Sequence, residues 1–216
     1  MYKAVFLDYT GTMVKEDEPY TRELLGYFIK NSSISDANMI LSIVWKKIKE
    51  VEASCYGEGF MLNHAKIDYV IDYLESEYGF SGDRNYVHET WEKIWIYAPL
   101  YEDVKPFFER VKCPIYILSN DDKVYLEKSM ELKGLKPTGI ICAELAHACK
   151  PNEKIFTYAL SVANLKPEEV LLIGDSIASD ITPAQKLGIS PILITRGKDV
   201  EAEGVRVIKS LSEVEM

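Results

Sequence analysis

The 216-residue sequence has few cysteines and histidines, no long apolar run and no basic segment. Its cysteines form no Cys-x-x-Cys pair, which argues against a zinc-binding module and predicts buried thiols in a reducing compartment. No apolar run approaches the roughly 20 residues of a membrane span, and none forms a signal-peptide core. We therefore expect a cytoplasmic protein that does not enter a membrane. The cysteines are Cys55, Cys113, Cys142 and Cys149.

The charge balance argues against nucleic acid and anionic lipid as partners. There are 25 Lys and Arg against 34 Asp and Glu, so the formal net charge is −9. The densest basic stretch, Lys46, Lys47 and Lys49, is followed at once by Glu50 and Glu52. No basic patch therefore offsets the repulsion of phosphate groups. Hydrophobic residues at 47% and charged residues at 27% are typical of a globular protein and exclude a disordered chain.

Short apolar runs separated by helical patterns predict a doubly wound α/β fold with a parallel sheet. The runs are rich in Ile, Val and Leu and do not alternate with polar residues, as expected for strands buried on both faces. The predicted strands cover residues 4–7, 115–118, 139–142, 170–173 and 191–194. Helical periodicity covers residues 122–133, 152–163 and 177–187, and Gly134 and Gly188 stand at helix ends.

The interval between the first two strands contains only helical patterns, over residues 20–30, 36–55, 63–78 and 83–97. We expect a core domain of residues 1–14 and 99–216, with a helical domain of residues 15–98 inserted into it. All three tryptophans, Trp45, Trp91 and Trp95, fall in the insertion. They are expected mainly as the core of a small helical bundle, and a substrate pocket is the alternative. Residues 54–59, with two glycines, are a candidate hinge or substrate-facing segment.

Carboxylates, a hydroxyl and a lysine follow the predicted strands, at the edge where open α/β sheets bind ligands. A single acidic residue at such a place is commonly part of a solvated turn, but four successive sites of this kind are not expected by chance. The segments are Asp8-Tyr9-Thr10-Gly11-Thr12, Ser119-Asn120-Asp121-Asp122, Lys150-Pro151, and Gly174-Asp175-Ser176 with Asp180 five residues beyond Asp175.

In this order, the segments resemble the four motifs of the haloacid dehalogenase superfamily of Mg-dependent phosphotransferases. The similarity extends over essentially the whole chain, and the helical insertion resembles the C1 cap of subfamily I. The resemblance implies a Rossmann-like core, a Mg²⁺ cofactor and hydrolysis of a small phosphorylated metabolite. The matching segments are Phe6 to Thr12, Ile117 to Asn120, Lys150-Pro151 with Ile155-Phe156, and Gly174 to Asp180.

The resemblance also implies a role for individual residues. Asp8 is the implied nucleophile, which forms an aspartyl-phosphate, and Lys150 offsets the clustered negative charge. Mg²⁺ prefers oxygen ligands. The implied metal site consists of Asp8, the backbone carbonyl of Thr10, Asp175 and, through metal-bound water, Asp180. The implied phosphate ligands are Ser119, the amide of Asn120, and Lys150.

Thr10 departs from the family pattern. In ordinary phosphatases of the superfamily this position holds a second aspartate, which protonates the leaving group and then activates water. A threonine hydroxyl does not titrate near neutral pH, so Thr10 cannot supply an acid/base contribution that is commonly worth about 10²–10⁴-fold in rate. Slow turnover, or a preference for good leaving groups, is therefore expected.

The variant at position 10 leaves other interpretations open. Asp-x-Thr-Gly-Thr resembles the phosphorylation site of P-type ATPases, an interpretation that fails because the sequence has no membrane spans. Phosphonate hydrolysis would require a cap lysine that forms a Schiff base; Lys49 is the candidate, although a solvated helix face is the simpler assignment. Dehalogenation is weakened because metal-free dehalogenases do not need Asp175. A non-catalytic phospho-switch protein is the third possibility.

The three histidines are further candidates. His64 and His88 lie in the helical insertion, where either is a candidate general acid, although an ordinary helix residue is the simpler interpretation. His147 precedes Lys150 by three residues and is expected near the site by family analogy.

Overall fold

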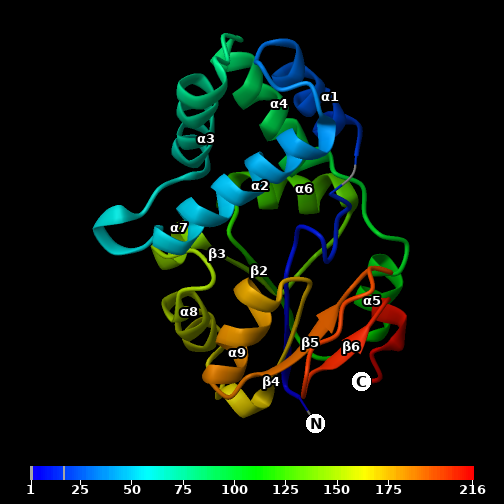
Figure 1. The fold of residues 1–216 in the computed structure, drawn as a ribbon. Helices are drawn as coiled ribbons and strands as arrows, with labels where there is room; N and C mark the ends of the chain where they lie inside the picture. Colours follow the sequence, from blue (N-terminus) through cyan, green and yellow to red (C-terminus); the bar gives the residue numbers. More distant parts are fainter. Residues whose placement is uncertain (1, 17) are drawn as a thin grey trace.

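The computed structural model describes residues 2–16 and 18–216, and these residues form a six-stranded parallel sheet flanked by helices (Figure 1). The strand order is β3-β2-β1-β4-β5-β6, and every neighbouring pair is parallel. The strands are β1 (Ala4–Leu7), β2 (Ile115–Ser119), β3 (Gly139–Cys142), β4 (Val170–Gly174), β5 (Ser190–Ile194) and β6 (Arg206–Ile208). The doubly wound α/β prediction is confirmed.

Nine α-helices lie in the described part of the chain. They are α1 (Pro19–Lys30), α2 (Ala37–Ser54), α3 (Asn63–Tyr78), α4 (Arg84–Tyr97), α5 (Val104–Arg110), α6 (Lys123–Lys133), α7 (Ala143–Ala146), α8 (Glu153–Ala163) and α9 (Thr182–Lys186). Short 3-10 turns occupy Gly57–Gly59, Pro167–Glu169 and Leu211–Glu213. None of the helices in the described residues has the length and apolar character that crossing a bilayer requires.

Both faces of the sheet are buried, which explains the unbroken apolar runs of the strands. Successive residues of β1 point to opposite faces: Val5 and Leu7 pack in one apolar cluster and Phe6 in another. The first cluster includes Phe107 of α5 and residues of α6, and the second includes Phe156 of α8 and Ala184 of α9. Two layers of helices therefore cover the sheet, as in other doubly wound folds.

The sheet region differs from the prediction, which contained neither helix α5 nor helix α7 and differed in two further features. Strand β6 was not predicted, because two of its three residues are exposed at the sheet edge and it lacks an apolar run. Residues 177–187 are helical, but they begin with a π-helical turn at Ile177–Ile181 before α9 starts. This turn places Asp180 inside the protein, where it is 1% exposed. Such π turns are frequent at functional sites.

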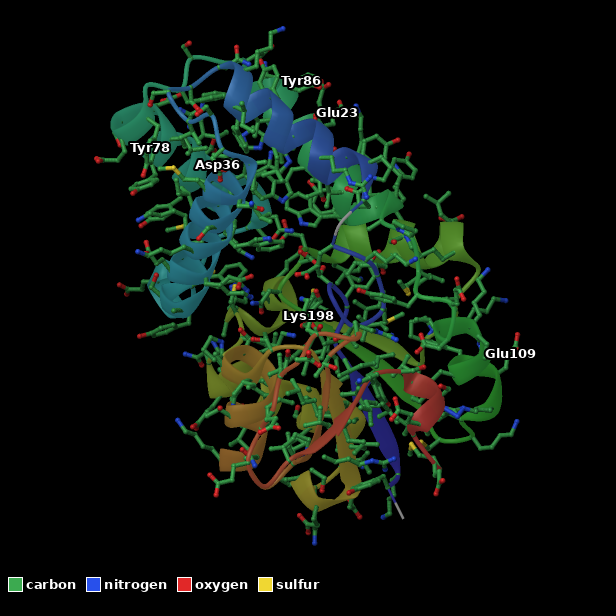
Figure 2. The ribbon with its side chains drawn as sticks, turned by 45° about the vertical axis from the view of Figure 1, so that its right-hand side comes forward. Glu23, Asp36, Tyr78, Tyr86, Glu109 and Lys198 are labelled. Atoms are coloured by element: carbon green, nitrogen blue, oxygen red, sulfur yellow. The ribbon has the colours of Figure 1, made fainter. Side chains whose placement is uncertain are left out.

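Helices α1 to α4 form a separate layer at the end of the molecule opposite the two termini (Figure 1). Their predicted bounds agree with the structure within one residue, and they bury an apolar cluster of their own. The two chain segments that join this layer to the sheet run side by side: Val14 forms an antiparallel bridge with Leu100, and Lys15 N donates to Pro99 O at 2.9 Å. Figure 2 shows Lys198 at the junction between the layers.

Candidate active site

A buried lysine lies between two carboxylates at the carboxyl edge of the sheet. Lys150 Nζ donates to Asp8 Oδ1 at 2.5 Å and to Asp180 Oδ1 at 2.6 Å. Asp8 directly follows β1, Asp180 lies in the π turn after β4, and Lys150 precedes α8. Lys150 is only 3% exposed, so it is not a surface lysine at a helix start.

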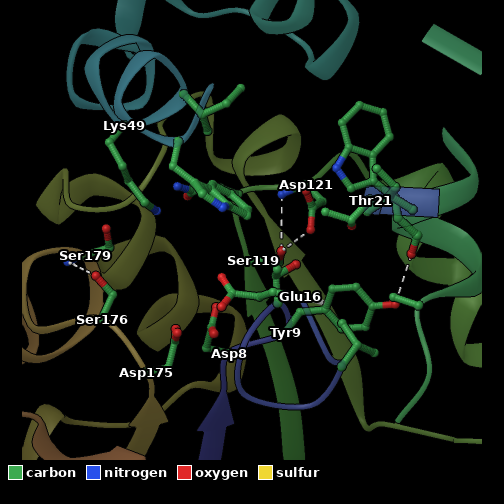
Figure 3. Close-up of a pocket in the computed structure, with 18 of the residues that line it drawn as sticks. Asp8, Tyr9, Glu16, Thr21, Lys49, Ser119, Asp121, Asp175, Ser176 and Ser179 are labelled. Carbon is green, nitrogen blue, oxygen red and sulfur yellow. Dashed lines mark hydrogen bonds between the residues drawn. The ribbon is translucent and has the colours of Figure 1, made fainter. Parts of the chain in front are cut away.

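Asp175 completes a group of three carboxylates with Asp8 and Asp180, and one oxygen from each residue lies within 4.8 Å of the other two. Asp8 and Asp175 lie side by side at their strand ends in Figure 3. Glycines allow this packing: a Cβ atom on Gly11 would lie 2.3 Å from Asp175 Oδ2, and one on Gly174 would lie 2.5 Å from Asp180 Cγ. Any side chain at these two positions would displace a carboxylate.

The electrostatics of this group are unbalanced, because one lysine faces three carboxylates. Burial, together with the charges of Asp8 and Asp180, raises the pKa of Asp175 to about 8. Burial raises the pKa of Asp180 to about 6 against the opposing charge of Lys150. Burial also opposes protonation of Lys150, but Asp180 and Asp8 outweigh it and the pKa of the lysine is raised. A bound cation would remove this excess of negative charge.

The residues present fit a magnesium ion. Asp8 Oδ2 is buried and has no hydrogen-bond partner among the described residues. Carboxylate oxygens are the ligands that Mg²⁺ prefers, and Thr10, whose carbonyl is the remaining candidate ligand, borders the same cavity as Asp8, Asp175 and Asp180. Asp8 Oδ2, which has no hydrogen-bond partner among the described residues, and the carboxylates of Asp175 and Asp180 together form a set of ligands suited to a divalent cation.

The loop after β2 supplies the hydroxyl of the site. Ser119 Oγ donates to Asp121 Oδ2 at 3.0 Å and accepts from Asp121 N at 3.2 Å (Figure 3). Asn120 Oδ1 accepts from Lys150 N at 2.6 Å, and its Nδ2 donates to Lys150 O at 3.1 Å. The Asn120 side chain therefore holds the lysine segment, so a contact between Asn120 and phosphate would come from its backbone.

These residues border a cavity of about 880 Å³ that lies between the helical layer and the sheet. Asp8, Thr10, Ser119, Asn120, Lys150, Asp175 and Asp180 all border it. The structure thus brings every predicted site residue to one place.

The sequence model of the haloacid dehalogenase-like hydrolase family matches residues 2–188. The chain belongs to this family. Two sequence relatives of this hydrolase are named as phosphatases. The glyceraldehyde 3-phosphate phosphatase of Pyrococcus furiosus is 41% identical over 54 residues, which are 25% of this chain and 22% of that protein. The phospholysine phosphohistidine inorganic pyrophosphate phosphatase of Xenopus laevis is 32% identical over 110 residues, 45% of this chain and 39% of that protein. The hydrolase therefore matches less than half the length of either relative.

Solved structures share the fold of this hydrolase over nearly its whole length. The L-2-haloacid dehalogenase from Xanthobacter autotrophicus has a TM-score of 0.78 at 17% identity and covers 98% of this chain and 96% of its own. The HAD-hydrolase YfnB from Bacillus subtilis, bound to magnesium, has a TM-score of 0.73 at 18% identity. The match covers 98% of this chain and 96% of that protein. At these identities the likeness establishes the fold alone.

Several charged residues that border the hydrolase's cavity were missed in the sequence, among them Lys66 and Glu52. Lys66 of α3 is 3% exposed, and its Nζ donates to Asn120 O at 2.8 Å and to Asn63 Oδ1 at 2.9 Å. Glu52 of α2 is also buried and accepts from Lys49 Nζ at 3.1 Å. Both residues lie on the apolar stripe of their helix, one turn from Val70 and Ile48 respectively. A charged residue on the apolar stripe of a predicted helix is the sequence signal that could have identified both residues.

Two further residues that border the cavity, Asp121 and Glu16, could not be identified from a helical pattern in the sequence. Asp121 lies two residues after Ser119, and burial raises its pKa to about 6. Glu16 lies four residues after Thr12, borders the cavity and pairs with Lys198 at 3.2 Å. Short polar segments at strand ends contain many such side chains, and only the tertiary arrangement shows which ones face the cavity.

The histidines do not border this cavity. His64 Nε2 lies 2.8 Å from Glu92 Oε1, and its ring stacks on that of His88 with centroids 4.6 Å apart. His147 is exposed and packs edge-on against Phe60 at 5.2 Å. His147 thus contacts the helical insertion and does not border the cavity, and neither His64 nor His88 is placed to act as a general acid.

Residues 54–59 do not border the cavity either, so the substrate-facing expectation for this segment is wrong. The segment packs on the chain just before Lys150: Tyr56 forms an antiparallel bridge with Ala148, and Cys149 N donates to Cys55 O at 2.8 Å. Cys55, Cys142 and Cys149 are buried as predicted, whereas Cys113 is only partly buried.

Proposed function

We propose that this hydrolase is a magnesium-dependent phosphatase of a small phosphorylated metabolite and acts through an aspartyl-phosphate on Asp8. The observation that carries the proposal is the position of Lys150 Nζ, 2.5 Å from Asp8 Oδ1 and 2.6 Å from Asp180 Oδ1, beside Asp175. Phosphoryl transfer requires an aligned nucleophile and positive charge around the phosphoryl oxygens. A buried lysine and a cation site beside one carboxylate meet both needs.

The reaction proceeds in two displacements on this proposal. A carboxylate oxygen of Asp8 attacks phosphorus, and the ester P–O bond breaks. The leaving alkoxide takes its proton from solvent, because Thr10 has none to give at neutral pH. Water then attacks the phosphorus of the aspartyl-phosphate, which releases inorganic phosphate and the Asp8 carboxylate.

The surrounding residues stabilise this chemistry. Lys150 holds Asp8 and offsets negative charge, and Ser119 Oγ with the Asn120 backbone amide hydrogen-bonds the phosphoryl oxygens. Asp8, the Thr10 carbonyl, Asp175 and Asp180 would hold Mg²⁺, which when bound supplies Lewis-acid stabilisation of the phosphoryl oxygens.

The domain division forms part of the proposal. Residues 15–98 would act as a C1-type cap over a core of residues 1–14 and 99–216. The separate apolar cluster of the helical layer and the paired joining segments at Val14 and Leu100 support this division. The substrate would enter between cap and core, where the cavity lies.

The decisive experiment incubates purified protein with Mg²⁺ and a panel of phosphate monoesters, beside Asp8→Asn. We expect phosphate release that requires both Asp8 and the metal. If no ester yields more phosphate with the wild type than with Asp8→Asn, the proposal is wrong. Stable BeF₃⁻ binding without turnover would then point to the phospho-switch alternative.

The phosphonate alternative has little support at Lys49. A Schiff-base lysine needs a lowered pKa. Burial acts to lower the pKa of Lys49, but the charge and the hydrogen bond of Glu52 together outweigh burial, and this pKa is raised. Borohydride treatment in the presence of a phosphonate aldehyde is therefore expected to leave Lys49 unmodified.

A further inference from the structure

The cavity of this hydrolase has two unlike ends. Its floor is the polar edge of the sheet around Asp8 and Lys150. The helical layer lines the rest of the cavity with charged side chains, among them Lys49, Glu52 and Lys66, and with a group of apolar side chains. The side chains that matter here are Leu41 and Trp45 of α2 and Trp91 and Trp95 of α4, which we call the apolar wall.

Leu41 and Trp45 have no role in the core of the helical layer. Their neighbours on α2, Ile40, Val44 and Ile48, belong to the apolar cluster of that layer. Leu41 and Trp45 belong to none of the three apolar clusters, are only half-buried, and border the cavity. Because residues four apart lie one above the other on a helix, the two side chains form one continuous surface that faces the cavity.

Trp91 and Trp95 extend this surface from α4. Both are buried, at 7% and 9% exposed, and their ring centroids lie 6.4 Å apart. They pack in the cluster of the helical layer and still border the cavity. The tryptophans were expected in the core of a helical bundle, with a substrate pocket as the alternative. Trp91 and Trp95 lie in that core and also border the cavity, whereas Trp45 borders the cavity without belonging to the core cluster.

The size of the cavity also bears on its ligand. At about 880 Å³ it lies near the upper end of the roughly 300–1,000 Å³ typical of sites for drug-sized ligands. A three-carbon phosphate ester on Lys150 would leave most of this volume and the whole apolar wall in contact with water. A ring system attached to the phosphate would occupy more of this volume and would cover part of the apolar wall.

The absence of a carboxylic acid at position 10 also favours a substrate with an aromatic ring. Without a carboxylic acid at Thr10, the leaving oxygen must depart with little help from a proton donor. A phenolic oxygen, with a pKa near 10 as in tyrosine, departs far more easily in this way than an alkoxide. An aromatic leaving group thus suits both the apolar wall and the missing acid.

We propose that the substrate is an aryl phosphomonoester whose ring packs against Leu41, Trp45, Trp91 and Trp95. This inference rests on the proposed phosphatase function, which supplies the reaction. Trp45 is the specificity-determining residue, because its ring borders the cavity and belongs to none of the three apolar clusters of the described residues.

Steady-state kinetics with three esters test the inference. Phenyl and 2-naphthyl phosphate have leaving groups of similar acidity but different apolar area, and glycerol 3-phosphate has no ring. We expect the lowest KM for 2-naphthyl phosphate and the highest for glycerol 3-phosphate. Trp45→Ala should raise the KM for 2-naphthyl phosphate about tenfold, the cost of losing one large apolar contact, and leave that for glycerol 3-phosphate unchanged.

Controls separate a contact from a folding defect. Tyr69→Ala removes an exposed aromatic ring from α3 that does not border the cavity, and should leave all three KM values unchanged. Trp45→Phe should retain most of the preference for the ring. Equal KM values for the three esters, or an equal change in all three upon Trp45→Ala, would overturn the inference.

A binding measurement distinguishes this inference from the proposed function. Calorimetry of Asp8→Asn with 2-naphthyl phosphate and glycerol 3-phosphate reports affinity without turnover. Tighter binding of the naphthyl ester that depends on Trp45 supports the aryl site even if the wild type hydrolyses nothing. Equal affinity for the two esters overturns it, even if the wild type is an active phosphatase.

Discussion

Lys150 is the residue on which the electrostatics of the site depend. It is buried between Asp8 and Asp180, and it opposes three carboxylates at once. Burying two charges is costly, so such a pair contributes less to stability than its short distances suggest. Removing one partner is worse, because the remaining carboxylates stay buried without compensation.

Replacement of Lys150 by methionine should therefore affect both activity and stability. We expect kcat to fall by about 10²–10³-fold, as for the loss of one preorganised donor, and the free energy of unfolding at pH 8 to fall by about 3–5 kcal/mol. Phosphate release and urea unfolding measure the two effects. Lys154→Met, which alters an exposed lysine of the same segment, should change neither.

Thr10 accounts for the slow turnover that we expect. Thr10→Asp should raise kcat by up to about 10²-fold for alkyl phosphates, which need a proton donor, and by less for aryl phosphates. Rates for both ester classes with wild type and Thr10→Asp provide the test. An unchanged rate with the alkyl esters would show that the missing acid does not limit turnover.

At the scale of elements, a buried hydroxyl next to the nucleophile anchors the end of helix α4. Tyr9 OH donates to Trp95 O at 3.0 Å and lies 2.5 Å from Ser129 Oγ, which donates to Ile96 O at 2.9 Å. Lys133 Nζ also donates to Ile96 O, at 2.7 Å. These groups satisfy carbonyls that the last turn of a helix leaves without partners. The helical layer is thereby held to the sheet layer through α6.

Tyr9→Phe should loosen this junction. The loss leaves the carbonyl of Trp95 without its donor and should lower the free energy of unfolding by about 1–3 kcal/mol. Urea unfolding measures the change. Tyr116→Phe is the matched control, because the Tyr116 ring packs on Phe6 without a hydroxyl partner among the described residues, and it should change stability little.

For the whole molecule, the clustered carboxylates predict that stability without metal falls as pH rises. The pKa values of Asp180, about 6, and Asp175, about 8, exceed the roughly 3.9 of an unfolded aspartate. The folded state therefore holds more protons than the unfolded state between these values, so folding is favoured at low pH and loses that advantage as pH rises from about 4 to 8.

Thermal melts in EDTA should show a melting temperature at least about 3 °C lower at pH 8 than at pH 6. Mg²⁺ should remove most of this difference, because it replaces the protons as the compensating charge. Asp175→Asn should flatten the dependence in EDTA. A melting temperature that rises from pH 6 to pH 8 in EDTA would contradict this account of the site.

Much of the fold followed from local patterns. The apolar runs of β1 to β5 and the periodicity of α1 to α4 placed these elements within one residue of their observed bounds. Such patterns are reliable because burial on both faces of a sheet, or on one stripe of a helix, leaves a repeat in the sequence. Strand β6 and the π turn before α9 left none, because an exposed edge strand and a local change of helix type depend on their surroundings.

The sequence by itself determined the α/β class and the helical insertion, because buried strands and helices leave apolar runs and helical periodicity in it. It also determined the order of Asp8, Ser119, Lys150 and Asp175, because each follows the end of a predicted strand or precedes a predicted helix. Only the tertiary structure decided which further side chains share their cavity. Lys66, Glu52 and Trp45 lie on helices far from those motifs in the chain, and the three histidines do not border the cavity. The physical reason is that a cavity is formed by the packing of distant elements, and no local repeat records which side of a helix a second layer will cover.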